Sequence, residues 1–175
     1  MGFCFFANAS VAARHALAAH GLERVAIIDF DVHHGNGTED CCAGDDRILM
    51  CSIFQHPFYP YSGADKPAAN MCNVPLAAGC GGEEFRDAVN QVWMPRLKEF
   101  KPQLIIISAG FDGHYEDDMG GLKLVEKDYA WCTEELKKVA AQFSEKRIVS
   151  MLEGGYVMTS LARSVGAHLR SLADL

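Results

Sequence analysis

Two carboxylates and an imidazole alternate along Asp29-Phe30-Asp31-Val32-His33, which leads into the turn-forming run His34-Gly35-Asn36-Gly37. Alternate side chains of an extended strand lie on one face, so the spacing predicts that Asp29, Asp31 and His33 lie together. Oxygen and nitrogen donors without cysteine suit a catalytic divalent metal that keeps one position free for water or substrate. The alternative, a strand that ends in solvated polar residues, is disfavoured because gathering like charges without a cation is costly.

Polar residues also follow the other apolar runs of the chain, which cover residues 24–30, 47–53, 103–108 and 147–152. Ser52 ends the second run, Gly110-Phe111-Asp112 follows the third, and Glu153-Gly154-Gly155-Tyr156 follows the fourth. Because the carboxyl ends of parallel strands meet at one edge of a sheet, we expect a third carboxylate and a phenol beside the metal site. Taken alone, Asp112 could instead cap a turn, and Tyr156 could pack against one.

The segments between these runs carry helical patterns. Four helices are predicted. The first runs from Asn8 or Ser10 to about His20, and the third is capped by Asp128. The second has Phe85, Val89, Val92 and Phe100 on its inner face and kinks or restarts at Pro95, and the fourth has Leu161, Val165, Leu169 and Leu172 on its inner face. The remaining stretch, 54–82, is punctuated by glycine and proline, which is typical of turns and loops. Strands that alternate with helices predict an α/β fold, a parallel sheet with helices on both faces.

Length and composition narrow the class of protein. The 175 residues suffice for one domain, and no apolar stretch is long enough to cross a bilayer. The start lacks the basic segment of a secretory signal, so we expect a soluble, cytoplasmic protein. Seven cysteines without a C-x-x-C pair argue against a disulfide framework and a zinc ribbon. A net charge of −7 disfavours nucleic acid and favours cationic or neutral partners.

An acidic segment follows Asp112. It contains His114, Glu116, Asp117 and Asp118, and we expect a solvated surface loop. The alternative is that this loop recognises a cationic substrate such as an acetylated polyamine. No role is assigned to four further histidines, His15, His20, His56 and His168.

Three motifs together resemble a known family. Asp29-Phe30-Asp31-Val32-His33-His34-Gly35-Asn36-Gly37, Ser108-Ala109-Gly110-Phe111-Asp112 and Glu153-Gly154-Gly155-Tyr156 look like the zinc-dependent histone deacetylase and acetylpolyamine amidohydrolase family, in particular its bacterial, class II-like members. The opening Gly2-Phe3-Cys4-Phe5-Phe6 is similar too, so the resemblance covers nearly all of residues 1–175. It implies an arginase/deacetylase-like fold and the hydrolysis of acetyl amides.

The resemblance implies a catalytic role for each matching residue. Asp31, His33 and Asp112 would be the zinc ligands, and the Tyr156 hydroxyl would hydrogen-bond the developing oxyanion. Asp29 would orient a catalytic histidine of the family. Zinc would polarise the acetyl carbonyl and acidify the attacking water, although ferrous iron accepts the same ligands.

The resemblance also implies a structural potassium ion and a substrate tunnel. The potassium ligands would be oxygens of Asp29, Ser52 and Ile53, with backbone oxygens near Asp31 and His33, since an alkali cation prefers oxygen. Phe3 and Tyr59 would form aromatic walls around an acetylated amine, which a small molecule or a protein lysine would carry. Gly155 would form the narrow floor.

The family carries a tandem histidine, its general base pair, upstream of the segment that matches Gly2-Phe3-Cys4, and His33-His34 is a different motif. We therefore expect residues 1–175 to form a partial deacetylase-like catalytic domain, without the N-terminal part of the fold. Such a chain should turn over slowly and can associate through an exposed sheet edge. The alternatives are a non-catalytic module that binds metal or an acylated ligand, and an arginase-like manganese ureohydrolase.

Overall fold

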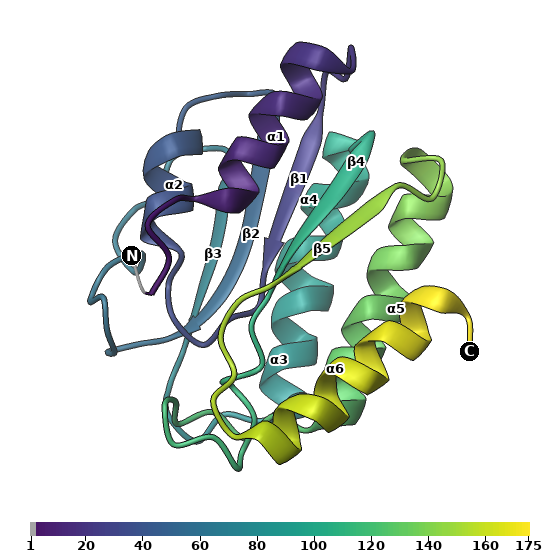
Figure 1. Cartoon of the computed structure of the whole chain (residues 1–175). Coiled ribbons are helices and arrows are strands. Elements are labelled where there is room, and N and C mark those ends of the chain that lie inside the picture. The colour runs from purple at the N-terminus through teal and green to yellow at the C-terminus, as the bar shows by residue number, and fades with distance from the viewer. Residues whose placement is uncertain (1–2) are drawn as a thin grey trace.

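The computed structural model describes residues 3–175, and these form one five-stranded sheet in which all neighbouring strands are parallel. The order across the sheet is β3-β2-β1-β4-β5 (Figure 1). The strands are β1 Val25–Asp29, β2 Ile48–Gln55, β3 Met71–Leu76, β4 Leu104–Ala109 and β5 Ile148–Leu152. The predicted parallel α/β fold is confirmed. Gly2, which begins the N-terminal motif, lies outside the described residues.

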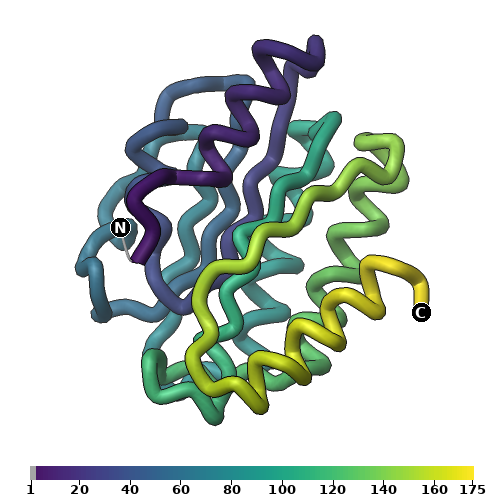
Figure 2. Tube along the Cα trace, viewed as in Figure 1, coloured from purple at the N-terminus to yellow at the C-terminus, as the bar shows by residue number. Residues whose placement is uncertain are grey.

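Helices cover both faces of the sheet, as the ribbon and the chain trace show (Figure 1, Figure 2). α1 (Asn8–Ala19) and α2 (Asn36–Cys42) lie on one face. The other face packs against α3 (Gly82–Ala88), the π-helix η1 (Val89–Trp93), α4 (Met94–Phe100), α5 (Glu126–Phe143) and α6 (Met158–Ala173). The larger cluster of buried apolar side chains lies on this second face.

The glycine- and proline-rich stretch from residue 54 to residue 82 contains a strand that its composition did not indicate. β3 pairs with β2 from Met71 to Leu76 and includes Pro75. A proline has no N–H to give to a sheet, but β3 lies at the end of the strand order and has one neighbour among the described residues. Pro75 is therefore tolerated because β3 is an edge strand, whereas a central strand would lose a hydrogen bond at that position.

Pro95 changes the type of helix rather than breaking it. The π-helical turn η1 ends at Trp93, and α4 begins at Met94, so Pro95 lies in the first turn of α4. A proline removes a backbone donor and crowds the preceding turn, and the first turn of a helix tolerates both effects best. The predicted restart is therefore present as a short π-helical segment.

Two predicted helix starts are shifted. Asn8 is the first residue of α1, and the cap is Ala7, which offers no side-chain oxygen. Asp128 is the third residue of α5, and its Oδ2 accepts a hydrogen bond from Val125 N at 3.0 Å. Asp128 thus closes the helix start from inside the first turn.

Two residues predicted to face the core are exposed instead. Val92 and Leu169 expose 36% and 53% of their surface, while the adjacent Trp93 and His168 are buried. The widened turn η1 shifts the inward face by one residue at Trp93. A buried polar residue, His168, takes the inward position in α6.

Burial decreases from the centre of the sheet to β5. Every residue of β1 is buried, and β1 has a paired strand on each side. β5 pairs with β4 alone among the described residues, and it exposes 44% of Val149 and 62% of Leu152. Between residues 3 and 175, no helix has the length and apolar character to cross a membrane.

Candidate functional site

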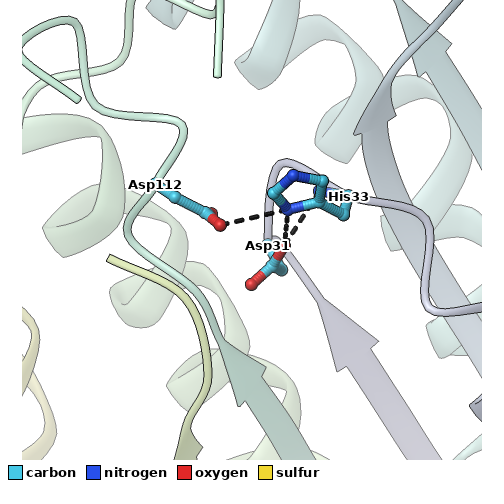
Figure 3. A group of neighbouring side chains, drawn as sticks. All are labelled: Asp31, His33 and Asp112. Carbon is cyan, nitrogen blue, oxygen red and sulfur yellow. Dashed lines mark hydrogen bonds and ion pairs between the residues drawn. The ribbon is translucent and has the colours of Figure 1, made fainter. Parts of the chain in front are cut away.

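Three side chains from neighbouring strands meet at the carboxyl edge of the sheet (Figure 3). Asp31 and His33 follow β1, and Asp112 follows β4, which pairs with β1. His33 Nδ1 lies 3.0 Å from Asp31 Oδ1 and 3.2 Å from Asp112 Oδ2. One candidate ligand atom of each residue lies within 4.8 Å of the others. The structure therefore brings the three predicted metal ligands together.

Short turns, rather than strand alternation, orient Asp31 and His33. β1 ends at Asp29, so the predicted extended spacing does not continue to His33. Asp29 Oδ1 accepts a hydrogen bond from Asp31 N at 3.1 Å, and Asp31 Oδ1 accepts one from His33 N at 2.8 Å. Aspartate favours such turns because its side chain bonds the backbone two residues on. Each carboxylate thus positions the next functional residue.

Two glycines let the backbone pass close to the carboxylates. A Cβ at Gly110 would overlap the Asp31 carboxylate, and one at Gly154 would overlap that of Asp112. Gly154 N donates to Asp31 Oδ2 at 2.9 Å, and Val32 N donates to Asp112 Oδ1 at 3.0 Å. Backbone amides therefore hold one oxygen of each carboxylate, and the other oxygen faces His33.

Burial and the neighbouring charges shift the pKa values of two residues of the cluster, Asp112 and His33. Burial, and then the nearby Asp31, raise the pKa of Asp112 to about 6. Burial lowers the pKa of His33, but its hydrogen bonds to Asp112 and Asp31 outweigh that effect and raise the pKa to about 10. The two carboxylates therefore favour a positive charge at the point where they meet His33.

A cavity of about 680 Å³ opens beside the cluster. Its aromatic lining consists of Phe3, Phe5, Phe6, Phe58, Tyr59 and Tyr156. The His33 ring stacks on Phe58, with ring centroids 5.3 Å apart. Asp118 and Glu153 also line the cavity, and none of the described lining residues is Lys or Arg. The two residues predicted as aromatic walls, Phe3 and Tyr59, thus lie in this cavity.

Tyr156 presents a protonated phenol to the cavity. Burial, and then Asp112 and Asp31, raise the pKa of Tyr156 to about 12, so the hydroxyl keeps its proton and can donate a hydrogen bond. The rings of Tyr156 and Phe3 meet edge to face at 5.8 Å. Gly155 has a φ of 135°, which favours glycine. Gly154, rather than Gly155, is among the residues that line the cavity.

The predicted potassium ligands lie together on β1 and β2. Asp29 pairs with Ser52 in the register of the two strands, and Ile53 follows. All three are buried, and Ser52 Oγ has no hydrogen-bond partner among the described residues. Burial, and then Asp31, raise the pKa of Asp29 well above its usual range. An unpartnered hydroxyl and a crowded carboxyl suit a cation that prefers oxygen.

The acidic loop after Asp112 is solvated only in part, so the prediction of a solvated loop fails for His114 and Asp117. His114 is inaccessible and Asp117 is 4% exposed, while Asp118 remains exposed. The Asp117 carboxylate accepts a hydrogen bond from Tyr156 N at 2.7 Å. Sequence reasoning also gave no role to Glu153, although its place directly after β5 put it at the edge of the sheet where the site lies.

Residues 1–172 match the model of the histone deacetylase domain. The chain belongs to the histone deacetylase family. A histone deacetylase-like amidohydrolase of Pseudomonas aeruginosa is 39% identical over 163 residues, which are 89% of this chain and 43% of that protein. Histone deacetylase 14, chloroplastic, of Arabidopsis thaliana is 39% identical over 178 residues, which are 98% of this chain and 42% of that protein.

The fold of this histone deacetylase family member agrees with a solved relative. The crystal structure of the HDA15 HD domain matches with a TM-score of 0.92 at 34% identity, covering 99% of this chain and 51% of that one. The arginase/deacetylase-like architecture is confirmed. The chain spans about half the length of the relatives named here, or less.

Proposed function

We propose that this chain, within the intact enzyme, supports zinc-dependent hydrolysis of acetyl amides, and that residues 1–175 are part of the catalytic domain. The cluster of Asp31, His33 and Asp112 carries the proposal. The Asp31 and Asp112 carboxylates converge there on His33 Nδ1, at 3.0 and 3.2 Å, and Asp112 is fully buried, an arrangement that is costly unless a positive charge lies between the two carboxylates. Two carboxylates and an imidazole fit zinc with one position left free.

The residues of the chain would divide the chemistry between them. Bound zinc would polarise the acetyl carbonyl and acidify the attacking water. The Tyr156 hydroxyl would hydrogen-bond the carbonyl oxygen as that oxygen gains negative charge. His33 would lose its proton before Nδ1 could serve as a ligand, because a metal binds only neutral imidazole.

The cavity supports an acetylated primary amine as the substrate, on a small molecule or on a protein lysine. Aromatic walls such as Phe58 and Tyr59 suit an alkyl chain. The carboxylates of Asp118 and Glu153, without a cationic side chain among the described lining residues, disfavour anionic substrates such as nucleic acid. The net charge of −7 acts in the same direction.

Oxygen donors near β1 and β2 support a structural potassium ion. The unpartnered Ser52 Oγ and the buried Asp29 carboxyl would bind it together with backbone oxygens near Asp31, His33 and Ile53. Its positive charge would favour the ionised form of Asp29.

The described imidazoles of the cavity are already engaged. His33 belongs to the cluster, and His34 lies 2.8 Å from both Ser62 Oγ and Glu39 Oε2. We propose that neither acts as a general base, so that residues 1–175 alone hydrolyse acetyl-lysine about two to four orders of magnitude more slowly than the intact enzyme. The same observation favours the second candidate, a module that binds metal or an acyl ligand without turnover. Turnover by the chain at the rate of the intact enzyme would contradict both statements.

Native mass spectrometry in zinc-containing buffer tests the metal site. We expect one zinc ion on the chain and none on Asp112→Ala. Asp87→Ala, which removes an exposed carboxylate of α3, is the matched control and should keep the ion. Specific zinc on Asp112→Ala, or none on the unmodified chain, would overturn the proposed ligand set for residues 1–175.

A further inference from the structure

The loop between β4 and α5 is bonded to the turn that carries Tyr156. Asp117 Oδ2 accepts hydrogen bonds from Tyr156 N at 2.7 Å and Val157 N at 3.2 Å, and its Oδ1 accepts one from Met119 N at 2.9 Å. In the chain trace the loop and the turn run side by side at the carboxyl end of the sheet (Figure 2). A buried carboxylate that receives three N–H groups forms stronger bonds than a neutral acceptor would.

Tyr156 has little other support from the sheet. It follows β5, the strand with a single described neighbour, and Gly155 precedes it with a φ of 135°. Its side chain is 41% exposed and contacts Phe3, which is itself 79% exposed. The Asp117 carboxylate therefore bonds the backbone at a residue whose own side chain is only partly packed.

We propose that Asp117 is a positioning residue that fixes Tyr156 relative to the metal ligand Asp112. The inference rests on the proposed role of the Tyr156 hydroxyl. Asp112 and Asp117 belong to the same loop. One segment therefore supplies a proposed metal ligand and also bonds the backbone of Tyr156. The loop is bonded in turn to α6, because Arg163 of α6 donates a hydrogen bond to Glu116 of the loop at 2.6 Å. Arg163 also donates to Glu126, the first residue of α5, at 2.5 Å.

Amide hydrogen exchange in the zinc-loaded chain tests the anchoring directly. Asp117→Asn replaces an accepting oxygen by a group that cannot receive the same N–H bonds with charge assistance. Exchange at Tyr156 N and Val157 N should become about ten- to a hundredfold faster, while exchange in the buried part of α5 stays the same. Asp118→Asn makes the same charge change at the next, exposed residue and should leave both amides unchanged. Unchanged exchange in Asp117→Asn would overturn the anchoring.

Asp117→Glu keeps the buried charge but lengthens the side chain, and it serves as a second variant should Asp117→Asn fold poorly. It should accelerate exchange at the same two amides. Circular dichroism melting of both variants verifies that they remain folded.

The link to the phenol is tested by a double-mutant cycle on ligand binding. The probe is a trifluoromethyl ketone, whose hydrate resembles the tetrahedral species of amide hydrolysis. Asp117→Asn should weaken its binding about tenfold in the unmodified chain and not at all in Tyr156→Phe. Equal weakening in both backgrounds would overturn the proposal. If Tyr156→Phe binds the ketone as tightly as the unmodified chain, the proposed role of Tyr156 fails, even where amide exchange still shows the bond from Asp117.

Discussion

β1 and β5 both end at the candidate site, but the rest of the molecule supports them differently. β1 is buried at every position between two paired strands, and the proposed metal site, Asp31, His33 and Asp112, follows β1 and its neighbour β4. β5 lies at the edge of the described sheet, and Tyr156 follows it after two glycines. The proposed metal ligands therefore follow buried, central strands, whereas Tyr156 follows an edge strand and its backbone N–H donates to a carboxylate from another loop. Metal binding and stabilisation of the oxyanion should thus be separable by mutation.

Tyr156→Phe should separate the two functions most sharply. Loss of one donor to a developing oxyanion lowers kcat by about 10² to 10³, and the zinc content should not change because no ligand is removed. Steady-state kinetics of the intact enzyme, with metal analysis of the same samples, measures both. Loss of zinc in Tyr156→Phe would show that metal binding at the centre of the sheet depends on Tyr156 at its edge.

Gly110→Ala should damage the centre of the sheet. A Cβ there would overlap the Asp31 carboxylate. The backbone cannot shift away from that overlap, because the neighbouring strands β1 and β4 are buried. Zinc affinity should fall by about a hundredfold, as measured by competition with a chromogenic chelator. Gly166→Ala in α6, where a Cβ meets only ordinary contacts, is the control. Unaltered affinity in Gly110→Ala would mean that the centre is more compliant than its burial indicates.

His168 of α6 contacts β5, and its titration should make the free energy of unfolding depend on pH. Its Nε2 lies 2.9 Å from Ser150 Oγ of β5, and its Nδ1 lies 2.7 Å from Thr133 Oγ1. Burial lowers the pKa of His168 from 6.5 to about 4. Above pH 6.5 neither the folded nor the unfolded state carries the proton. As the pH falls below 6.5, the unfolded state binds it first, and the folded state loses about 2 kcal/mol of stability by pH 5.

Urea unfolding at several pH values measures this effect in the unmodified chain and in His168→Gln. The variant should lose less stability between pH 6.5 and pH 5, and replacement of the exposed His15 by Gln should not change the slope. Parallel curves for the unmodified chain and His168→Gln would contradict the assignment to His168.

The open side of β5 should promote association of the isolated chain. Leu152 and Val149 are exposed on an edge strand, and such strands pair with other chains unless a charge interrupts them. Leu152→Lys should weaken self-association about tenfold in sedimentation experiments. Val11→Lys, which changes an equally exposed residue of α1, should have no effect. A chain that stays monomeric at all concentrations would contradict the prediction.

The placement of a residue could be predicted from the sequence where that placement follows from the order of the strands. Asp31, His33 and Asp112 were placed together because the ends of parallel strands meet, and the structure brings them within ligand distance of one another. Their orientation was not predictable, because it depends on β1 ending at Asp29 and on the turns that follow.

Features that depend on contacts between distant segments were missed. β3 contains Pro75, and only its position at the sheet edge makes that residue acceptable. Asp117 was expected to be solvated. The local sequence does not distinguish a loop aspartate that is hydrated from one that accepts a hydrogen bond from a distant backbone amide. The buried His168 has no periodic signal of its own, since its partners lie on α5 and β5.

The hydrogen bond from Val32 N to Asp112 Oδ1 joins residues that are 80 positions apart in the chain. The three proposed metal ligands should therefore come together only after β1 and β4 have paired, and pairing between residues so far apart in sequence is slow. Of these three residues, only Asp31 and His33 are close in sequence, so an unfolded chain cannot offer the complete set to an ion. Zinc should consequently leave the refolding rate unchanged and slow unfolding. The ion would then stabilise the folded state without guiding its formation.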